Sequence, residues 1–156
     1  PDGSSFYESR FILEFLELKH PTPPLLPPDV DGILAAKRLE VLCDGVCDAL
    51  VTTFFERLRP QEHQSKEWTA RQRRKIDGGL REIARSIGTR DWAVGECFGL
   101  GDIAACTVTG YLTVRFPDIE WRGLYPDLAR YADRIGARPS FKATVPYPQN
   151  ITDKVV

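Results

Sequence analysis

A run of prolines divides this chain into two parts of different character. Five of the eight residues from 21 to 28 are proline. Proline has no backbone N–H to donate and its ring fixes φ, so this run excludes a helix and favours an extended, fairly stiff connector. We therefore expect a domain boundary here: residues 1–20 belong to one unit, residues 21–28 form a linker, and residues 29–156 form a second unit.

The first twenty residues read as the end of a structure that begins elsewhere. Asp2-Gly3 is typical of a tight hairpin turn, and Phe6-Tyr7 is a candidate for the returning strand. Nothing precedes Pro1 that could form the outgoing strand, and the 156 residues include no methionine. We therefore expect this chain to be a piece of a longer protein. After the turn, apolar residues at helical spacing predict a helix over residues 8–19, with Ser9 near its cap.

Beyond the linker the apolar pattern is helical throughout. Either Asp29 or Asp31 can cap a long helix that runs to Arg59 and ends at Pro60. Its apolar residues recur every three or four positions, which predicts one buried face.

A second helix is predicted between Ser65, which can cap its start, and Gly88, which can end it. Gly78-Gly79 lies inside this helix, where each glycine costs about 1 kcal/mol relative to alanine. A close contact with another helix would explain the pair, and so would a kink. The sequence does not choose between these two explanations.

A third helix begins after Gly99, which we take as its cap. Asp102 is then the third helical residue, and its carboxylate can accept a hydrogen bond from the N–H of the cap. Phe98 and Ile103 stand at the two positions that form a hydrophobic staple around such a start. The helix is apolar on nearly every side, so we expect it at the centre of a bundle. Pro117 ends it.

A fourth helix over residues 126–136 and a short one over residues 140–144 complete the pattern. Pro126 suits a first helical turn, and Gly136 and Pro139 close the segment. The predicted fold class is mostly α: a helical bundle preceded by the remnant of another domain.

Composition excludes several functions. Hydrophobic residues make up 42% of the chain, which suffices for a packed core, and the formal net charge is -1. Such a balance provides no field that would draw the protein to nucleic acid or to an anionic membrane. No apolar stretch reaches the length needed to cross a bilayer.

The four cysteines are too few for a disulfide framework, so we expect free thiols in a reducing, cytoplasmic setting. Cys43 and Cys47 lie four residues apart on the long helix, with Asp44 beside them, which is a conceivable metal pair. Neither histidine of the chain stands at a ligand spacing to them, so we expect no metal and small buried side chains instead.

Four stretches together resemble one family. Residues 2–16 resemble the last strand and third helix of the thioredoxin-like domain of a glutathione S-transferase, and residues 110–116 resemble the central helix of its helical domain. Residues 43–49, followed by residues 55–60, resemble the long helix of a bacterial subgroup. Residues 98–103 resemble the family's capping motif, which normally has serine or threonine where this chain has Gly99, so only the Asp102 half of that motif remains.

The resemblance implies the fold and one part of a site. The fold would be the all-helical C-terminal domain of a glutathione S-transferase, with strand 4 and helix 3 of the thioredoxin-like domain before it. Glu8 and Ser9 match the acid and serine that hold the γ-glutamyl end of glutathione. A helix N-terminus carries positive partial charge and free N–H donors, which suit a carboxylate. From the residues alone, Ser9 could equally cap its helix and Glu8 could complement the helix dipole.

The resemblance also implies what this chain lacks. The serine, cysteine or tyrosine that activates the glutathione thiol would lie upstream of Pro1, so we expect no catalytic residue here and no conjugation by the chain alone. The longer protein would conjugate glutathione to a small electrophile, as a cytoplasmic homodimer active in detoxification. Cys43 would contribute to the electrophile pocket, and Asp44 would reach the glutathione site, including that of a partner subunit. The alternative is a non-catalytic relative that binds partners with the same fold.

Overall fold

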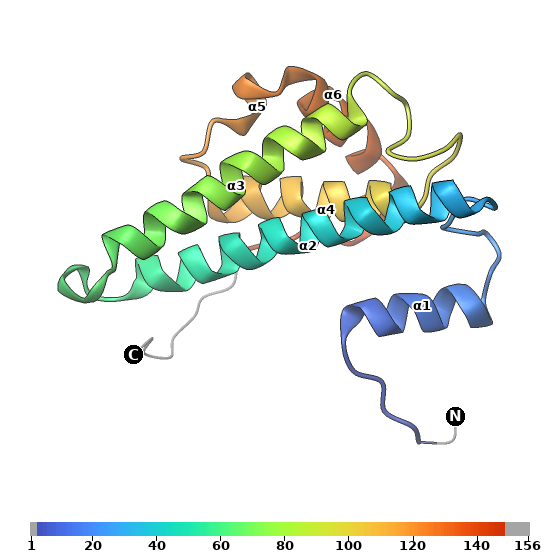
Figure 1. The fold of residues 1–156 in the computed structure, drawn as a ribbon, viewed down its shortest axis with the longest axis horizontal. Coiled ribbons are helices and arrows are strands. Elements are labelled where there is room, and N and C mark those ends of the chain that lie inside the picture. Colours follow the sequence, from blue (N-terminus) through green and yellow to red (C-terminus); the bar gives the residue numbers. More distant parts are fainter. Residues whose placement is uncertain (1–2, 149–156) are drawn as a thin grey trace.

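The computed structural model describes residues 3–148, and these residues form helices and no strands (Figure 1). The longest elements are α2 (Val30–Leu58), α3 (Lys66–Ile87) and α4 (Leu100–Arg115). The others are α1 (Ser9–Lys19), the 3-10 turn η1 (Gln61–His63), α5 (Trp121–Leu124), α6 (Pro126–Gly136) and α7 (Pro139–Ala143). Within the described range, no helix is both long and apolar enough to cross a membrane.

The predicted helix boundaries are confirmed where a cap marks them. Asp29 caps α2, its carboxylate accepting the N–H of Gly32 at 2.8 Å. Ser65 caps α3 through its hydroxyl, which accepts the N–H of Trp68 at 3.2 Å. Gly88 ends α3 with φ of 57°, a left-handed conformation that glycine adopts without strain. The turns η1 and α5 were not predicted, because segments of three or four residues show no period.

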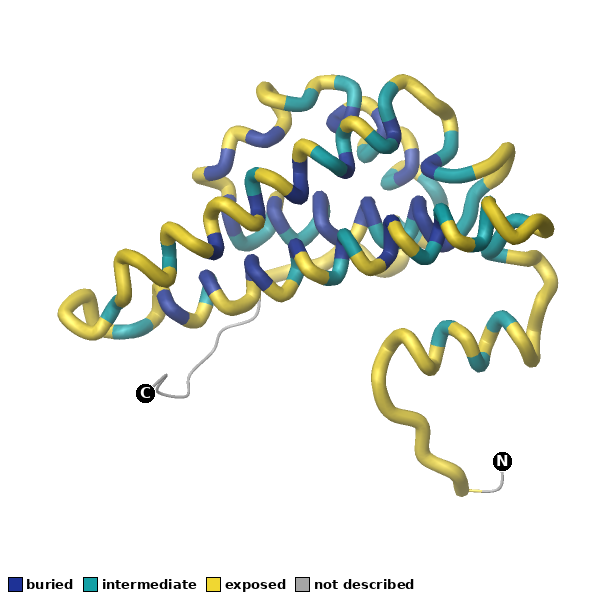
Figure 2. Tube along the Cα trace, in the orientation of Figure 1, coloured by how far each residue is buried: buried dark blue, intermediate teal, exposed yellow. Residues whose placement is uncertain are grey.

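The core lies where α2, α3 and α4 meet, with α6 against α3 and α4 (Figure 2). Fully buried side chains come from each of the three long helices, for example Leu50, Ile83 and Leu112, all 0% exposed. The structure explains one glycine of the pair. A Cβ on Gly79 would lie 2.1 Å from Cγ2 of Val46, so α3 approaches α2 closely there, whereas a Cβ on Gly78 would meet nothing within 4 Å. Close contact explains Gly79; nothing in the structure explains Gly78.

The start of α4 is held by Asp102, as predicted. Its carboxylate is 1% exposed and accepts the N–H of Gly99 at 2.9 Å, the N–H of Ala93 at 3.1 Å and the hydroxyl of Tyr131. Burial and the bond to Asp102 raise the pKa of Tyr131, so its proton stays in place as a donor. The staple between Phe98 and Ile103 stays a prediction.

Gly99 has a physical reason to differ from the usual serine or threonine. A Cβ at this position would lie 2.6 Å from the carbonyl oxygen of Leu25. That carbonyl accepts the N–H of Leu100 at 2.8 Å and so joins the proline-rich segment to the first turn of α4. A backbone bond therefore satisfies one of the free N–H groups of this helix start.

The helix α1 lies beside the bundle and buries none of its residues (Figures 1 and 2). The strand expected at Phe6-Tyr7 is absent: residues 3–8 are irregular, because no other segment of residues 3–148 forms a strand with which they could pair. Instead the ring of Phe6 packs on those of Phe11 and Phe15, with centroids 5.9 and 4.4 Å apart.

Candidate functional site

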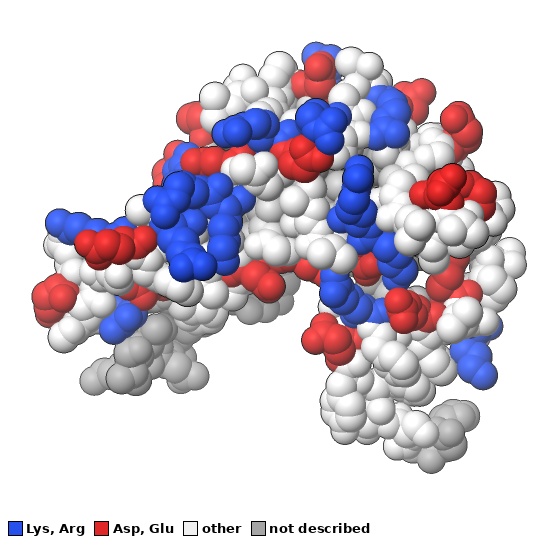
Figure 3. All heavy atoms as spheres, viewed as in Figure 1, with Lys and Arg blue, Asp and Glu red and all other residues white. Residues whose placement is uncertain are grey.

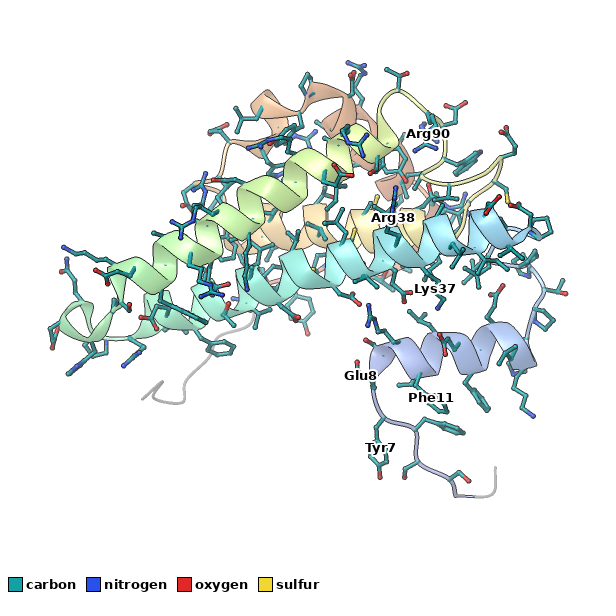
Figure 4. All side chains as sticks on the ribbon, viewed as in Figure 1. Tyr7, Glu8, Phe11, Lys37, Arg38 and Arg90 are labelled. Atoms are coloured by element: carbon teal, nitrogen blue, oxygen red, sulfur yellow. The ribbon has the colours of Figure 1, made fainter. Side chains whose placement is uncertain are left out.

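An open cleft of about 470 Å³ lies between the start of α1 and the middle of α2. Glu8, Ser9 and Arg10 line it from one side, and α2 lines it from the other with Val41, Asp44, Gly45, Cys47 and Asp48. The structure thus brings together three of the predicted site residues, Glu8, Ser9 and Asp44, from segments 35 residues apart. Figure 4 shows Glu8 at the N-terminal end of α1.

Glu8 has an unusual backbone conformation. Its φ is 69° and its ψ is 120°, and no other non-glycine residue among those described has a positive φ. A side chain with a Cβ is strained in this region, at a cost of order 1–3 kcal/mol, and such strain is concentrated at functional sites. The carbonyl of Glu8 accepts the N–H of Ile12 at 3.0 Å, so this residue is the cap of α1.

The side chains of Glu8 and Ser9 do not serve the helix itself. Glu8 makes no side-chain cap bond, and Ser9 is the first helical residue rather than the cap. The Ser9 hydroxyl donates to Oε1 of Glu8 at 3.4 Å, and both residues are exposed. The residues at the start of α1 line the cleft, and the first turn holds no acidic residue that would neutralise the positive end of this helix. This arrangement suits a ligand that carries a carboxylate beside an ammonium group.

One ion pair bridges the cleft. Nε of Arg10 lies 3.0 Å from Oδ2 of Asp44, and about half of each side chain is exposed. An exposed pair of this kind contributes little to stability. It does join α1 to α2 across the cleft. Sequence analysis identified Asp44 but missed Arg10, because two residues 34 positions apart share no local pattern.

Only one of the two cysteines of α2 is buried, as was expected of both. Cys43 is 1% exposed and belongs to the core, so its predicted place in a pocket finds no support. Cys47 lines the cleft instead, although sequence analysis gave it no role there. Burial, and then the charges of Asp44 and Asp48, raise the pKa of Cys47 to about 11. Its thiol is therefore protonated at neutral pH and is a poor nucleophile.

The spacing on α2 could have revealed the cleft wall. Val41, Asp44, Gly45 and Asp48 recur at intervals of three and four, which places them on one helix face, but their mixed polarity hid that face from a search for apolar stripes. Among residues 3–148, no group of three histidine, cysteine or acidic side chains is placed to hold a metal ion.

Comparison with known proteins gives consistent matches. Residues 66–134 match the family model described as glutathione S-transferase, C-terminal domain. The chain is 67% identical to a glutathione S-transferase from Methylobacterium radiotolerans, solved in complex with glutathione sulfonate. This match covers 100% of this chain and 74% of that one, with a TM-score of 0.97. A glutathione S-transferase from Methylobacillus flagellatus, solved with glutathione bound, is 40% identical over 94% of this chain and 72% of its own, with a TM-score of 0.89. The uncharacterized GST-like protein YibF of Escherichia coli is 30% identical over 93% of this chain and 71% of its own length.

Proposed function

This chain belongs to the glutathione S-transferase family, and from that premise we propose that the protein carrying it conjugates the thiolate of glutathione to a small electrophile. The observation that carries the proposal is the start of α1, where the side chains of Glu8 and Ser9 line a cleft and make no cap bond to their own helix. Two structural relatives with glutathione or its sulfonate bound support the choice of ligand.

Each group at the start of α1 has a role in this proposal. The Glu8 carboxylate pairs with the ammonium of the γ-glutamyl residue, a charge-assisted bond. The Ser9 hydroxyl and the free N–H groups of the first turn bind the neighbouring carboxylate, which the helix dipole also stabilises. The strained backbone of Glu8 is retained because it holds the acid beside the hydroxyl in this arrangement.

We place the group that stabilises the thiolate upstream of Pro1. Cys47 is the thiol in the cleft, and its raised pKa makes it unsuitable for activating another thiol. The proposal also keeps the division into residues 1–20 of a thioredoxin-like domain, a linker over residues 21–28 and a helical domain from residue 29 onward. The helical domain would form the wall of the electrophile pocket, in a cytoplasmic homodimer in which Asp44 approaches the partner's glutathione.

The test uses the full-length protein and two substitutions. Glu8→Gln and Ser9→Ala should each raise the KM for glutathione about tenfold or more, since each loses a bond of about 1.5–3 kcal/mol to a charged group. Glu67→Gln is the matched control, because Glu67 is an exposed acid in the first turn of α3, away from the cleft. An unchanged KM in both cleft variants would refute the assignment.

A second measurement separates enzyme from binding protein. The full-length protein should be retained on immobilised glutathione and should conjugate chlorodinitrobenzene. If the protein is retained on glutathione but turns over none of the electrophiles tried, the non-catalytic alternative is favoured. The chain of 156 residues by itself should not conjugate, and clear turnover by it would contradict our placement of the activating group.

A further inference from the structure

The ion pairs between α1 and α2 show the direction in which a ligand held at the start of α1 continues. Arg10 pairs with Asp44, and Glu14, further along α1, pairs with Lys37, earlier in α2. The two helices therefore run in opposite directions (Figure 1). The N-terminal end of α1, where the proposed function places the γ-glutamyl group, points toward the later part of α2. The partner that glutathione attacks is therefore expected along that part.

The cleft face of α2 changes there from acidic to apolar. Asp48 lines the cleft one turn beyond Asp44, about 6 Å further along the helix axis. Val51 and Phe55 follow at intervals of three and four residues, which continues the same helix face. Both are apolar side chains left exposed, to 37% and 41%. A ligand that reaches from the start of α1 to this apolar surface passes Asp48.

The carboxylate of Asp48 has no counter-ion. Among residues 3–148 it makes no hydrogen bond or ion pair, and the residue is exposed. The other acids of the cleft are matched, because Asp44 pairs with Arg10 and, under the proposed function, Glu8 pairs with the ammonium of the ligand. In Figure 3, basic side chains gather over α3, which does not line the cleft. The α2 wall of the occupied cleft therefore keeps one unbalanced negative charge.

The thiol of Cys47 reports the electrostatic potential in this part of the cleft. Burial is the main reason why its pKa is raised to about 11, and the charges of Asp44 and Asp48 add to the effect. Surroundings that disfavour a thiolate at Cys47 also disfavour an anionic group that a ligand brings to the same place.

We propose that Asp48 is a specificity-determining residue: it discriminates against anionic electrophiles, such as aromatic carboxylates, in favour of neutral ones whose apolar body covers Val51 and Phe55. This inference rests on the proposed function, since it takes glutathione as the ligand of the cleft. It adds what that function leaves open, the charge of the partner that glutathione attacks.

The experiment compares two glutathione conjugates that differ by one charge. The chlorides 4-chloro-3,5-dinitrobenzamide and 4-chloro-3,5-dinitrobenzoate both react with the glutathione thiolate by forming a C–S bond and releasing chloride. The purified conjugates then carry a neutral carboxamide or a carboxylate on the same ring. By calorimetry, the full-length protein should bind the amide conjugate more tightly. In Asp48→Asn the ratio of the two affinities should fall about threefold, because one Coulomb repulsion at the protein surface is removed.

Asp31→Asn is the matched control. Asp31 is an exposed acid in the first turn of the same helix, about 25 Å from Asp48 along the axis. Since the Debye length is about 8 Å at physiological salt, the control should leave the affinity ratio unchanged. Each variant replaces an exposed carboxylate by an amide of the same size, so both should fold as the parent does.

Two results would overturn the inference. One is an unchanged affinity ratio in Asp48→Asn; if both conjugates then bind more weakly to the same extent, Asp48 binds the glutathione part that they share. The other is a preference of the parent that persists at about 1 M salt, where the Debye length is about 3 Å, because a charge effect would be screened there.

Turnover of the two chlorides separates this inference from the function on which it rests. If the parent binds the conjugates with the expected preference but converts neither chloride, conjugation fails and the selectivity of the cleft stands. If it converts both, and Asp48→Asn does not change the ratio of their kcat/KM values corrected for the uncatalysed reactions, conjugation stands and this inference fails. If neither conjugate binds, both fail.

Discussion

Two helices of this molecule, α1 and α4, are held in place in different ways. α4 buries eight of its sixteen residues between α2 and α6, while α1 buries none of its eleven. α1 is tied to the rest by side-chain bonds instead: Arg10 to Asp44, Glu14 to Lys37, and Glu17 to the backbone of Leu25 and Leu26. Packing therefore defines the bundle, and polar bonds define the position of the helix that carries the candidate site.

The difference teaches how stability and function are divided here. Hydrophobic burial contributes most of the folding free energy, at about 25 cal/mol per Å² of apolar surface, and nearly all of it lies in the bundle. Glu8 and Ser9 lie on the part that contributes little, so they can hold a strained backbone without endangering the fold.

The largest effect is expected from Asp102 in the bundle. Asp102→Ala leaves two backbone N–H groups and the Tyr131 hydroxyl without their acceptor, and each unsatisfied donor costs about 1–3 kcal/mol. The free energy of unfolding in urea should fall by about 3 kcal/mol or more. Tyr131→Phe removes only one of the three donors and should cost about 1 kcal/mol. Similar losses in both variants would show that Asp102 does not organise the start of α4.

The glycine pair of α3 allows a matched test of packing. Gly79→Ala places a methyl group against Val46 and should destabilise the bundle by about 1–3 kcal/mol. Gly78→Ala adds a methyl group in open space and should stabilise it by up to about 1 kcal/mol, because alanine favours a helix more than glycine does. Urea denaturation of both variants gives the two signs. Equal signs would contradict the close approach of α2 and α3.

Glu17 is the counterpart of Asp102 on α1. Its carboxylate accepts the N–H of Leu25 at 3.0 Å and that of Leu26 at 3.2 Å, but it is only partly buried, so water can replace it. Glu17→Ala should lower the free energy of unfolding by less than about 1 kcal/mol. Amide hydrogen exchange within α1 should nevertheless accelerate about tenfold, while exchange in α2 stays unchanged. A loss of global stability as large as that of Asp102→Ala would contradict our view that α1, unlike α4, contributes little to the stability of the fold.

The smallest effect is expected from the pair of Arg10 and Asp44. A double-mutant cycle with Arg10→Gln and Asp44→Asn should give a coupling energy of about 0.2–1 kcal/mol, since both side chains are about half exposed. At about 1 M salt the Debye length is about 3 Å, so the coupling should vanish. A coupling that survives high salt would indicate a desolvated pair and a more rigid cleft.

Local sequence signals predicted most of the fold. Asp29, Ser65 and Gly88 act on neighbours within four residues, so their effect can be read along the chain. The same holds for Asp102 and the cap it completes, and these predictions are confirmed. The predicted strand at Phe6-Tyr7 was wrong for the described residues, because a strand depends on a partner and not on its own sequence alone.

Contacts between distant segments could not be predicted in this way. The cleft joins Glu8 to Val41 and Asp44 of α2, across more than thirty residues. Which of two cysteines one turn apart faces the core depends on the rotation of α2 about its axis, so Cys43 and Cys47 were not distinguished. The collision that excludes a side chain at Gly99 likewise involves Leu25, which precedes α2 and α3 in the chain.

The loose attachment of α1 has a practical consequence for ligand screening. If α1 detaches at a lower temperature than the bundle melts, a molecule in the cleft is released before the main transition and leaves the observed midpoint unchanged. A thermal-shift screen would then score true cleft ligands as inactive, yet detect compounds that bind to the bundle. Spectroscopic probes on α1 itself, for example at Phe11 or Phe15, would detect the cleft ligands that the main transition misses.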